Sequence, residues 1–430
     1  MNDEPHALSR EQFLALASGG GLAAIGNLVA AQHSKHVTLL YGVQKAAQAD
    51  AWPDSRLALA GHELLDRVQR VMPDAADDVI RHPSVGAWAL HTLRGDDTIP
   101  GARLGGLASI AAAAAIKAGI AAKIEVPVTN SVVVLPSLGA ADARGATAVV
   151  DTSPARVSSA GLRVRLTPGA PGWQELRPFR AGELNVLIDD LDPFRMPATD
   201  GKPTGRLTQA QLADLAAMWR AGWKVLDRAT AADIAALVQV IVPYQGPEDG
   251  YVSTSSPQTF GTVALSRQPD QYTCGETLVH EAQHLKLCAL LDLVDLTLPD
   301  DGRLYYAPWR DDPRPASGLL QGAYAFLGVA GFWRRQRHAA AEVAIRHRAD
   351  AEFARRRADS ALAVSALLAS GQLTAAGMDF AGEMARVLAA WQEEPVPAEA
   401  LAIANRKAQS HLARWRARNG PAATTTPGAA

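Results

Sequence analysis

The chain has 430 residues, of which 48% are hydrophobic and 20% are charged, so it holds enough apolar surface for one large core or several smaller ones. This composition excludes a mainly disordered protein. The 42 lysines and arginines nearly balance the 44 acidic residues, and the formal charge of −2 offers no broad basic surface to a polyanion. We therefore expect no nucleic-acid partner.

Cysteine usage and the apolar stretches bear on the cellular compartment. Cys274 and Cys288 are the two cysteines and form no CxxC pattern, which excludes a disulfide framework or a Cys-rich zinc module and fits a reducing compartment. The N-terminus lacks the basic-then-apolar order of a secretory signal. The most apolar stretch, residues 107–126, carries Lys117 and Lys123, so we interpret it as a buried helix. We expect a cytoplasmic protein with no membrane partner.

Hydrophobic periodicity predicts the elements in chain order. Ser9 and Gln12 have the spacing of a capping box, and the helix that they begin should end at the glycines 19–21. Residues 22–47, 57–71 and 85–93 continue the helical pattern, whereas 123–128, 131–136, 147–150, 162–166 and 183–190 have the pattern of short strands. Residues 207–236 return to helix, with Trp219 and Trp223 expected in the core. Strands at 240–244 and 260–267 then precede a long helix from near Thr273.

These patterns predict an α+β fold with four regions. They are a helical N-terminal region (1–122), an α/β middle region that contains sheet (123–238), a mostly helical C-terminal region (239–419), and a disordered tail (420–430). The HExxH motif described below is the reason why we expect residues 239–419 to form a zincin-like catalytic domain that binds a metal.

An acidic cluster follows the strand predicted at 183–190. Asp189, Asp190 and Asp192 allow a metal site, or they mark a strand end that runs into a turn containing proline. The alternating ligands, central glycine and terminal glutamate of a calcium loop are absent, so we favour the turn.

The motif HExxH, formed by His280, Glu281 and His284, carries the clearest chemistry. Residues four apart lie on one face of a helix, so both imidazoles can reach one metal while Glu281 lies beside it. The surrounding helix is apolar, and a metal would satisfy polar side chains that are costly to bury there. A TVAL segment precedes the helix, as an edge strand does in zincin metallopeptidases. The alternative is a surface helix with incidental histidines.

The third ligand is less clear. Cys288 continues the spacing, but it lies about 12 Å along the helix from His280, too far for both to bind one ion. In GLLQGAYAF, Gln321 occupies the position at which gluzincin peptidases have a zinc-binding glutamate. Its amide is a weaker ligand than a carboxylate, and a backbone-bonded buried amide is an equal alternative. Further candidates are Asp292, Asp295 and Glu342, for which we favour a solvated or capping role.

The polar, aromatic loop 299–315 follows the metal helix. Its Arg310 and Arg314 can bind a carboxylate with two hydrogen bonds each, and Tyr306 can add one, which suits a dicarboxylate cosubstrate or a substrate carboxyl. Lys286 is a further cation nearby. Because Asp311 and Asp312 follow Arg310 directly, an ion-paired loop is an equal alternative. The basic stretches after Trp333, RRQRH and RHRADAEFARRR, are interpreted as a solvated helix face.

The stretch from Leu278 to Trp333 resembles the bacterial HExxH proteins that are encoded beside ribosomally made peptide precursors. The likeness rests on LVHEAQHLKLCALLDLVDL, YYAPWRDDPRP and GLLQGAYAFLGVAGFW, and more loosely on FLALASGGG, AAQHSKHVTLL, HPSVGAWAL and LIDDLDPFRMP. That family, first described as a peptide-modification or metallohydrolase group, includes iron(II) and 2-oxoglutarate-dependent peptide β-hydroxylases. Many relatives carry His where this chain has Phe326, so we do not expect an essential ligand at that position.

The resemblance implies an oxidoreductase of ribosomal-peptide biosynthesis, a dioxygenase that hydroxylates a side-chain β-carbon of a precursor peptide. Iron(II) would be bound by His280 and His284, with Gln321 as a weak third ligand or one water away, and Glu281 would orient the ligands. Arg310 or Arg314 would anchor the distal carboxylate of 2-oxoglutarate. The alternatives are a zinc metallopeptidase in which Glu281 is the general base, and a non-catalytic scaffold that binds peptides.

Overall fold

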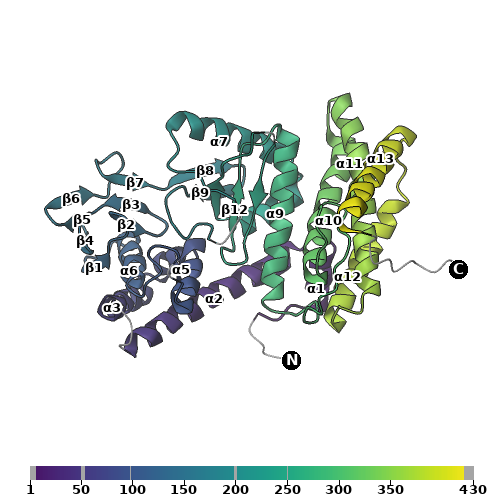
Figure 1. Cartoon of the computed structure of the whole chain (residues 1–430). Coiled ribbons are helices and arrows are strands. Elements are labelled where there is room, and N and C mark those ends of the chain that lie inside the picture. The colour runs from purple at the N-terminus through teal and green to yellow at the C-terminus, as the bar shows by residue number, and fades with distance from the viewer. Residues whose placement is uncertain (1–5, 50–53, 97, 198–200, 249, 421–430) are drawn as a thin grey trace. The chain divides into compact units, whose positions relative to one another are not determined.

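The computed structural model describes residues 6–49, 54–96, 98–197, 201–248 and 250–420 (Figure 1). Apart from Gly420, the predicted disordered tail lies outside these residues. The chain forms two compact units, each assembled from segments that are distant in sequence. The helical unit contains Met1–Val29, Ala221–Leu237 and Asp270–Ala430, and the mixed unit contains Ala30–Arg220 and Val238–Pro269.

The named elements of the helical unit are all helices. They are α1 (Arg10–Ala17), the start of α2 (Leu22–Gln48), the end of α7 (Gln209–Lys224), α8 (Arg228–Leu237), α9 (Gln271–Leu291), α10 (Ala316–Ala339), α11 (Val343–Ala369), α12 (Ala375–Gln392) and α13 (Ala398–Asn419). The predicted capping box begins α1: the Ser9 hydroxyl accepts from the Gln12 amide, and the Gln12 side chain accepts from the Ser9 amide. That prediction is confirmed.

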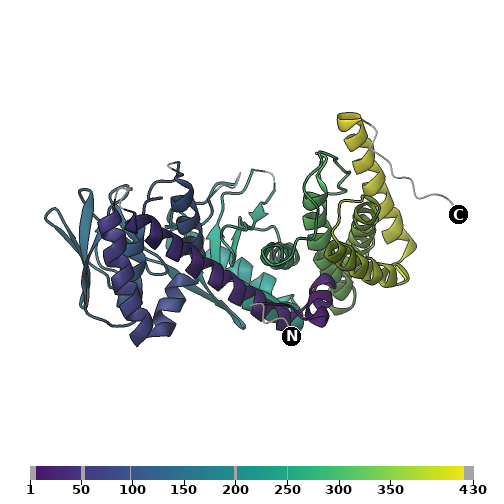
Figure 2. The same cartoon turned by 90° about the horizontal axis from the view of Figure 1, so that it is seen from below.

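Long helices lie side by side in this unit. Helix α11 packs against α10, α12 and α13, and α9 packs against α8 and α10 (Figures 1 and 2). Phe332, Trp333, Phe353 and Phe380 are almost fully buried between these helices and supply much of the apolar area that stabilises the unit. The long helix predicted from near Thr273 is α9, so the HExxH motif lies on an element held by packing on two sides.

The mixed unit combines the remaining helices with three sheets. Its helices are α3 (Ser55–Val71), α4 (Pro73–Ile80), α5 (Pro83–Arg94) and α6 (Gly106–Lys117), together with most of α2 and α7. Helix α6 forms the first part of the apolar stretch 107–126 that we interpreted as a buried helix, and nine of its twelve residues are buried. The end of that stretch is a strand, β1 (Lys123–Pro127), so the helix is shorter than predicted. It packs against α3, where a Cβ on Gly61 would lie 2.6 Å from the backbone nitrogen of Ala108, so only glycine permits this approach.

Two sheets of this unit are antiparallel throughout. The four-stranded sheet has the order β1-β4-β5-β6, and the three-stranded sheet has the order β2-β3-β7. The strands are β1 (Lys123–Pro127), β2 (Val132–Leu135), β3 (Gly139–Asp142), β4 (Thr147–Thr152), β5 (Ala155–Ser159), β6 (Leu162–Arg165) and β7 (Trp173–Glu175). Strand β1 packs on α6, across the boundary that the sequence predicted at residue 122.

The third sheet has the order β11-β12-β10-β9-β8. It contains β8 (Arg177–Ala181), β9 (Leu184–Ile188), β10 (Val240–Pro243), β11 (Ser253–Thr254) and β12 (Thr262–Leu265). Strand β12, the TVAL segment, pairs in parallel with β10 and antiparallel with β11. It therefore has a neighbour on both sides, and our comparison of it with the zincin edge strand is wrong.

The predicted α+β class, with helical ends and a sheet-containing middle, is confirmed. The helical stretch predicted at 207–236 is two helices, α7 and α8, because Asp227 caps the second through the amides of Ala229 and Thr230. Trp219 and Trp223 are both buried, as predicted. In the described residues no single helix is long and apolar enough to cross a membrane, and α1 with α2 reaches that length only across a 100° bend.

Candidate functional site

The HExxH motif lies in the middle of α9. This helix begins where the Asp270 carboxylate accepts hydrogen bonds of 2.8 Å from the amides of Tyr272 and Thr273, and Arg348 holds the same carboxylate at 2.9 Å. Fifteen of its residues are buried, so its orientation within the helical unit is fixed by packing. The side chains of the motif therefore start from a rigid backbone.

The two histidines of the motif converge. His280 Nε2 and His284 Nε2 are 3.1 Å apart, and the ring centroids are separated by 4.7 Å. With metal–nitrogen bonds of about 2.1 Å, this separation corresponds to an angle of about 95° at a shared ion. Burial, followed by the charges of His284 and Arg356, lowers the pKa of His280 well below its ordinary value. His280 is therefore a neutral imidazole, which is the form that binds metals.

Gln321 fixes the orientation of His284. Its Oε1 lies 3.1 Å from His284 Nδ1, and its Nε2 donates to the sulfur of Cys288 at 3.7 Å. An amide oxygen can only accept, so Nδ1 of His284 carries the proton and the lone pair of Nε2 is directed at His280. The structure thus places Gln321 beside His284, in contact with Nδ1 and not with the nitrogen that faces His280. Its role as a weak third metal ligand stays a prediction.

Aromatic side chains and one arginine surround the pair. The ring of Phe326 is 5.0 Å from that of His280, and Trp309 lies 4.9 Å from Phe326. The Arg356 guanidinium stands 4.6 Å from the centroid of the same phenylalanine ring. Glu281 is 2% exposed. The loop predicted to lie next to the metal helix therefore reaches the site through Trp309.

None of the carboxylates that we considered as third ligands joins the histidines. Asp292 and Glu342 are the residues that end α9 and precede α11, and the backbone oxygen of Asp295 accepts from Thr374. In the described residues, the one group of three metal-binding side chains with ligand atoms within 4.8 Å of one another is His82, Asp189 and Asp192. Cys288 also contributes no third ligand, as its axial separation predicts.

The loop residues predicted to bind a cosubstrate are engaged with other partners. Arg310 and Arg314 both pair with Asp312, at 2.8 and 3.4 Å, which is the ion-paired alternative. Tyr306 bonds to His411 Nδ1 at 2.8 Å, and burial raises the pKa of the phenol to about 12. Both arginine side chains stay at least one-third exposed.

Lys286 does not lie with the histidines. Its ammonium group donates to the carbonyl of Gly19 at 2.7 Å, and it is 3.4 Å from Asp233. It lines a cavity of about 370 Å³ whose wall also includes Val279, Ala282 and Gln283, the opposite side of α9. The assignment of Lys286 to cosubstrate binding at the metal is therefore not supported by its position, because two residues after His284 a helix has turned by about 200°.

The basic stretch on α11 is not a solvated face. Arg357 is buried, and the side chain of Arg356 is 15% exposed and lies 3.3 Å from Glu352 and 3.4 Å from Glu276. The sequence interpretation missed Arg356 because alternating charges on a helix usually indicate exposure. In the sequence, the aromatic residues of α10 were the feature that could have indicated that Arg356 lies beside Phe326.

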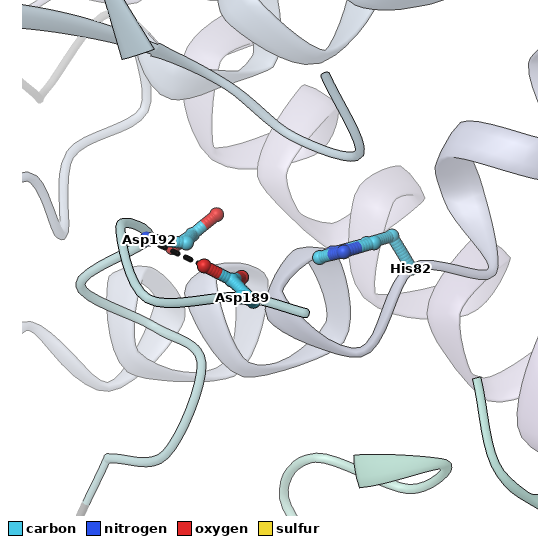
Figure 3. Close-up of side chains that lie close together, drawn as sticks. All are labelled: His82, Asp189 and Asp192. Carbon is cyan, nitrogen blue, oxygen red and sulfur yellow. Dashed lines mark hydrogen bonds between the residues drawn. The ribbon is translucent and has the colours of Figure 1, made fainter. Parts of the chain in front are cut away.

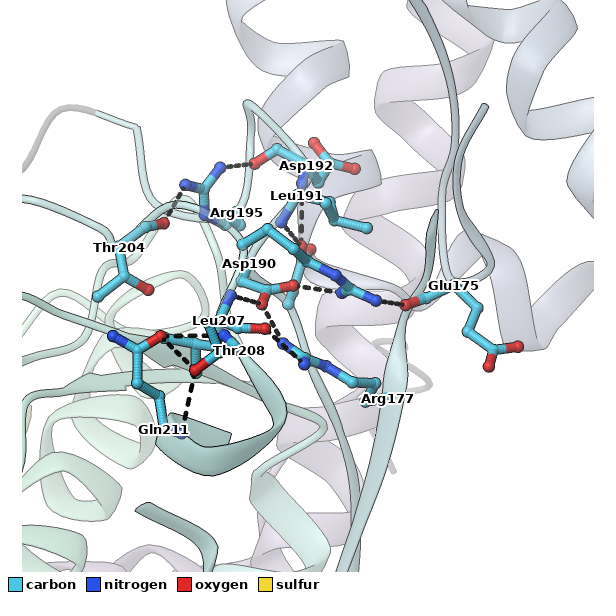
Figure 4. A network of polar contacts seen from close by, with 12 residues as sticks. Glu175, Arg177, Asp190, Leu191, Asp192, Arg195, Thr204, Leu207, Thr208 and Gln211 are labelled. Atoms are coloured by element: carbon cyan, nitrogen blue, oxygen red, sulfur yellow. Dashed lines mark hydrogen bonds and ion pairs between the residues drawn. The ribbon is translucent and has the colours of Figure 1, made fainter. Parts of the chain in front are cut away.

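The acidic cluster after β9 divides into two roles. Asp190 is fully buried and binds Arg177, Arg206 at 2.6 Å and the amide of Leu207 at 2.9 Å (Figure 4). It is therefore a structural ion-pair centre. Asp189 Oδ1 accepts from the amides of Leu191 and Asp192, which forms the turn that we favoured.

His82 joins Asp189 and Asp192, although the sequence interpretation did not identify it as a ligand. All three side chains are buried, and neither His82 Nε2 nor Asp189 Oδ2 has a hydrogen-bond partner. Burial raises the pKa of Asp189 to about 7, with Asp192 adding to the shift, and lowers the pKa of His82 to about 3. Each buried polar atom left without a partner costs about 1–3 kcal/mol. The only sequence signal was a histidine placed before Pro83, between two helices.

A search against protein-family models and against curated proteins found no match to this chain.

Proposed function

We propose that the protein is an iron(II) and 2-oxoglutarate-dependent hydroxylase that acts on a side-chain β-carbon of a ribosomally made precursor peptide in the cytoplasm. The 3.1 Å approach of His280 Nε2 to His284 Nε2 is the observation that supports a metal centre. In the described part of the chain, no third His, Cys, Asp or Glu places a ligand atom within 4.8 Å of both histidines. A centre with two histidines leaves positions for a 2-oxo acid and dioxygen, which favours an oxygenase over a closed structural zinc site.

The side chains present fit such an ion. Neutral His280 and the Nδ1-protonated form of His284 each offer one lone pair, and Gln321 keeps the second ring in this tautomer. When bound, iron(II) and 2-oxoglutarate supply the oxidation: dioxygen is consumed, 2-oxoglutarate becomes succinate and CO₂, and one oxygen atom enters a C–H bond of the substrate. We assign Glu281 the role of orienting the ligands from beside the motif.

The surrounding residues would keep water away and bind the cosubstrate. Phe326 and Trp309 form an apolar wall beside His280. For the distal carboxylate of 2-oxoglutarate, Arg310 and Arg314 would have to exchange Asp312 for the cosubstrate. Arg356 already lies within electrostatic range of His280, and we add it to these two candidates.

Single alanine variants of the three arginines distinguish the anchor. Loss of a charge-assisted pair to a carboxylate should raise the apparent dissociation constant for 2-oxoglutarate about 30-fold or more. Lys286→Met is the matched control, since this cation lies on the other side of α9 and should leave the constant unchanged. If all three alanine variants keep the wild-type constant, the carboxylate is bound elsewhere.

The function itself is tested by anaerobic loading with iron(II), followed by addition of 2-oxoglutarate, dioxygen and the peptide encoded by the neighbouring open reading frame. Succinate formation and a peptide mass increase of one oxygen atom are expected, and His280→Ala with His284→Ala should abolish both. Cleavage of the peptide with zinc alone would show the metallopeptidase, with Glu281 as general base. Peptide affinity without any metal bound after reconstitution would show the non-catalytic scaffold.

A further inference from the structure

A second cluster of ligand-type side chains lies in the mixed unit, separate from the HExxH motif. It consists of His82, which precedes α5, and of Asp189 and Asp192, which follow β9 (Figure 3). One ligand atom from each lies within 4.8 Å of the other two, and the three residues are 4%, 0% and 4% exposed, respectively. The close-up shows the imidazole ring directed toward the two carboxylates.

Ser84 lies between His82 and Asp192. His82 Nδ1 is 2.8 Å from the Ser84 hydroxyl oxygen, and Ser84 is close enough to the Asp192 carboxyl to lower its pKa. In the tautomer in which Nδ1 donates to the serine oxygen, Nε2 of His82 carries the lone pair. The Nε2 atom is buried and has no hydrogen-bond partner. This is the arrangement in which an outer hydrogen bond orients a metal-binding histidine.

The carboxylates are held in a similar way. Asp189 Oδ1 accepts two backbone amides, at 3.0 and 2.9 Å, whereas its Oδ2 is buried without a partner. Asp192 Oδ1 accepts the amide of Phe194 at 2.8 Å. Arg195, whose charge acts on both carboxyl groups, donates to the backbone oxygens of Asp192 and Thr204 (Figure 4). The cluster therefore presents carboxyl oxygens in fixed positions.

We propose that His82, Asp189 and Asp192 bind a divalent first-row transition metal such as Mn²⁺, Fe²⁺ or Zn²⁺. One imidazole nitrogen with two carboxylate oxygens is a ligand set that suits these ions, and small side-chain movements would bring the three atoms to bonding distance. A cavity of about 60 Å³, lined in part by Ser84, Asp192 and Phe194, adjoins the cluster. This volume admits water to complete the coordination shell.

The ligand set argues against a calcium or magnesium site and against a plain hydrogen-bonded cluster. Calcium and magnesium prefer oxygen ligands only, and here a buried nitrogen is one of three donors. A hydrogen-bonded cluster would pair His82 Nε2 with Asp189 Oδ2, yet both atoms lack a partner. A cation between them satisfies both atoms at once.

The test uses the full-length chain with His280→Ala and His284→Ala, which removes the other histidine pair, and Co²⁺ or Mn²⁺ as the probe. One equivalent should bind, and pulsed EPR of the Mn²⁺ form should show coupling to one imidazole nitrogen. Asp189→Asn in this background should weaken binding at least about 100-fold, and Ser84→Ala about 10- to 100-fold, as for other residues that orient a ligand. His36→Gln, which removes a buried histidine bonded to the Ile80 carbonyl, is the matched control and should keep the affinity.

Asp189→Asn in the otherwise wild-type chain separates the outcome for this site from the outcome for the proposed hydroxylase. Asp189→Asn should lower the metal stoichiometry by one equivalent whether or not His280 and His284 also bind an ion. Absence of a stoichiometric metal in the His280→Ala, His284→Ala protein, or an EPR spectrum without nitrogen coupling, overturns the proposal. An unchanged affinity in Asp189→Asn overturns it as well.

Discussion

Replacement of Gln321 tests how the metal helix and the following helix cooperate. The Gln321 oxygen is 3.1 Å from His284 Nδ1, close to the usual length of a hydrogen bond between an N–H group and an oxygen. In Gln321→Ala the Nδ1 proton loses its acceptor, and the ring can rotate or change tautomer. Such outer hydrogen bonds change metal affinity about 10- to 100-fold, which corresponds to about 1.4–2.8 kcal/mol of binding free energy. We expect a loss of this size for zinc and for Co²⁺.

Gln321→Glu should have the opposite effect. A carboxylate in the same position accepts the Nδ1 proton more strongly and makes Nε2 of His284 a better donor to the metal. It also adds a negative charge near the ion. Zinc affinity should rise, and hydroxylase turnover should change by at least about tenfold, or about 1.4 kcal/mol in the activation barrier.

The assay is competition with a chromophoric chelator for zinc and for Co²⁺, with 2-oxoglutarate turnover measured in parallel. Gln283→Ala is the control: Gln283 is a buried amide within the same motif, but it donates to the carbonyl of Gly19 at 3.0 Å. The reasoning is refuted if Gln321→Ala keeps the wild-type affinity, or if Gln283→Ala loses as much. If Gln321→Glu also matches wild type in affinity and turnover, Gln321 is outside the site.

Three further outcomes are expected. Phe326→His should raise the metal affinity at least about tenfold, because the centroid of the Phe326 ring is 5.0 Å from that of His280, close to the 4.7 Å between His280 and His284. Equilibrium titration with the metal checks this, and Phe326→Leu, which adds no nitrogen, should not show the gain. Burial raises the pKa of Asp359 to about 6, so the ionised carboxylate disfavours folding. The free energy of unfolding of the wild-type protein, compared with that of Asp359→Asn, should therefore fall by up to about 3 kcal/mol between pH 4 and 6 and stay level above pH 6. Denaturant titrations at each pH measure this difference, and its absence would exclude the effect. The thiol of Cys274 is fully buried, and burial raises its pKa to about 12, so alkylation at pH 8 followed by mass spectrometry should find it unmodified in the native protein and modified after denaturation; rapid native labelling would contradict this.

The local features of the fold could be predicted from the sequence because they depend on residues a few positions apart. The capping box at Ser9, the buried helix α6 and the convergence of His280 with His284 each follow from helical spacing and side-chain type. Most predicted strands match structural ones for the same reason, since alternation and turn residues act over short stretches.

The partners of these side chains were decided only by tertiary packing. Arginine is a residue type that suits a carboxylate cosubstrate. In the folded loop, however, Arg310 and Arg314 both pair with Asp312. Lys286 is two residues from a motif histidine, and the turn of α9 directs it to Asp233. Charge and spacing in the sequence do not specify which long-range partner is nearest.

The His82 cluster shows this division most clearly. The sequence determined the turn at Asp189, because that carboxylate bonds to the amides of the next residues. It did not determine that a histidine between α4 and α5 would lie against this turn, because that contact depends on how α5 and β9 are placed within the mixed unit. The turn alone is therefore compatible with a purely structural role. The third side chain, His82, is brought to it by the fold, and it is the reason why we propose a metal site there.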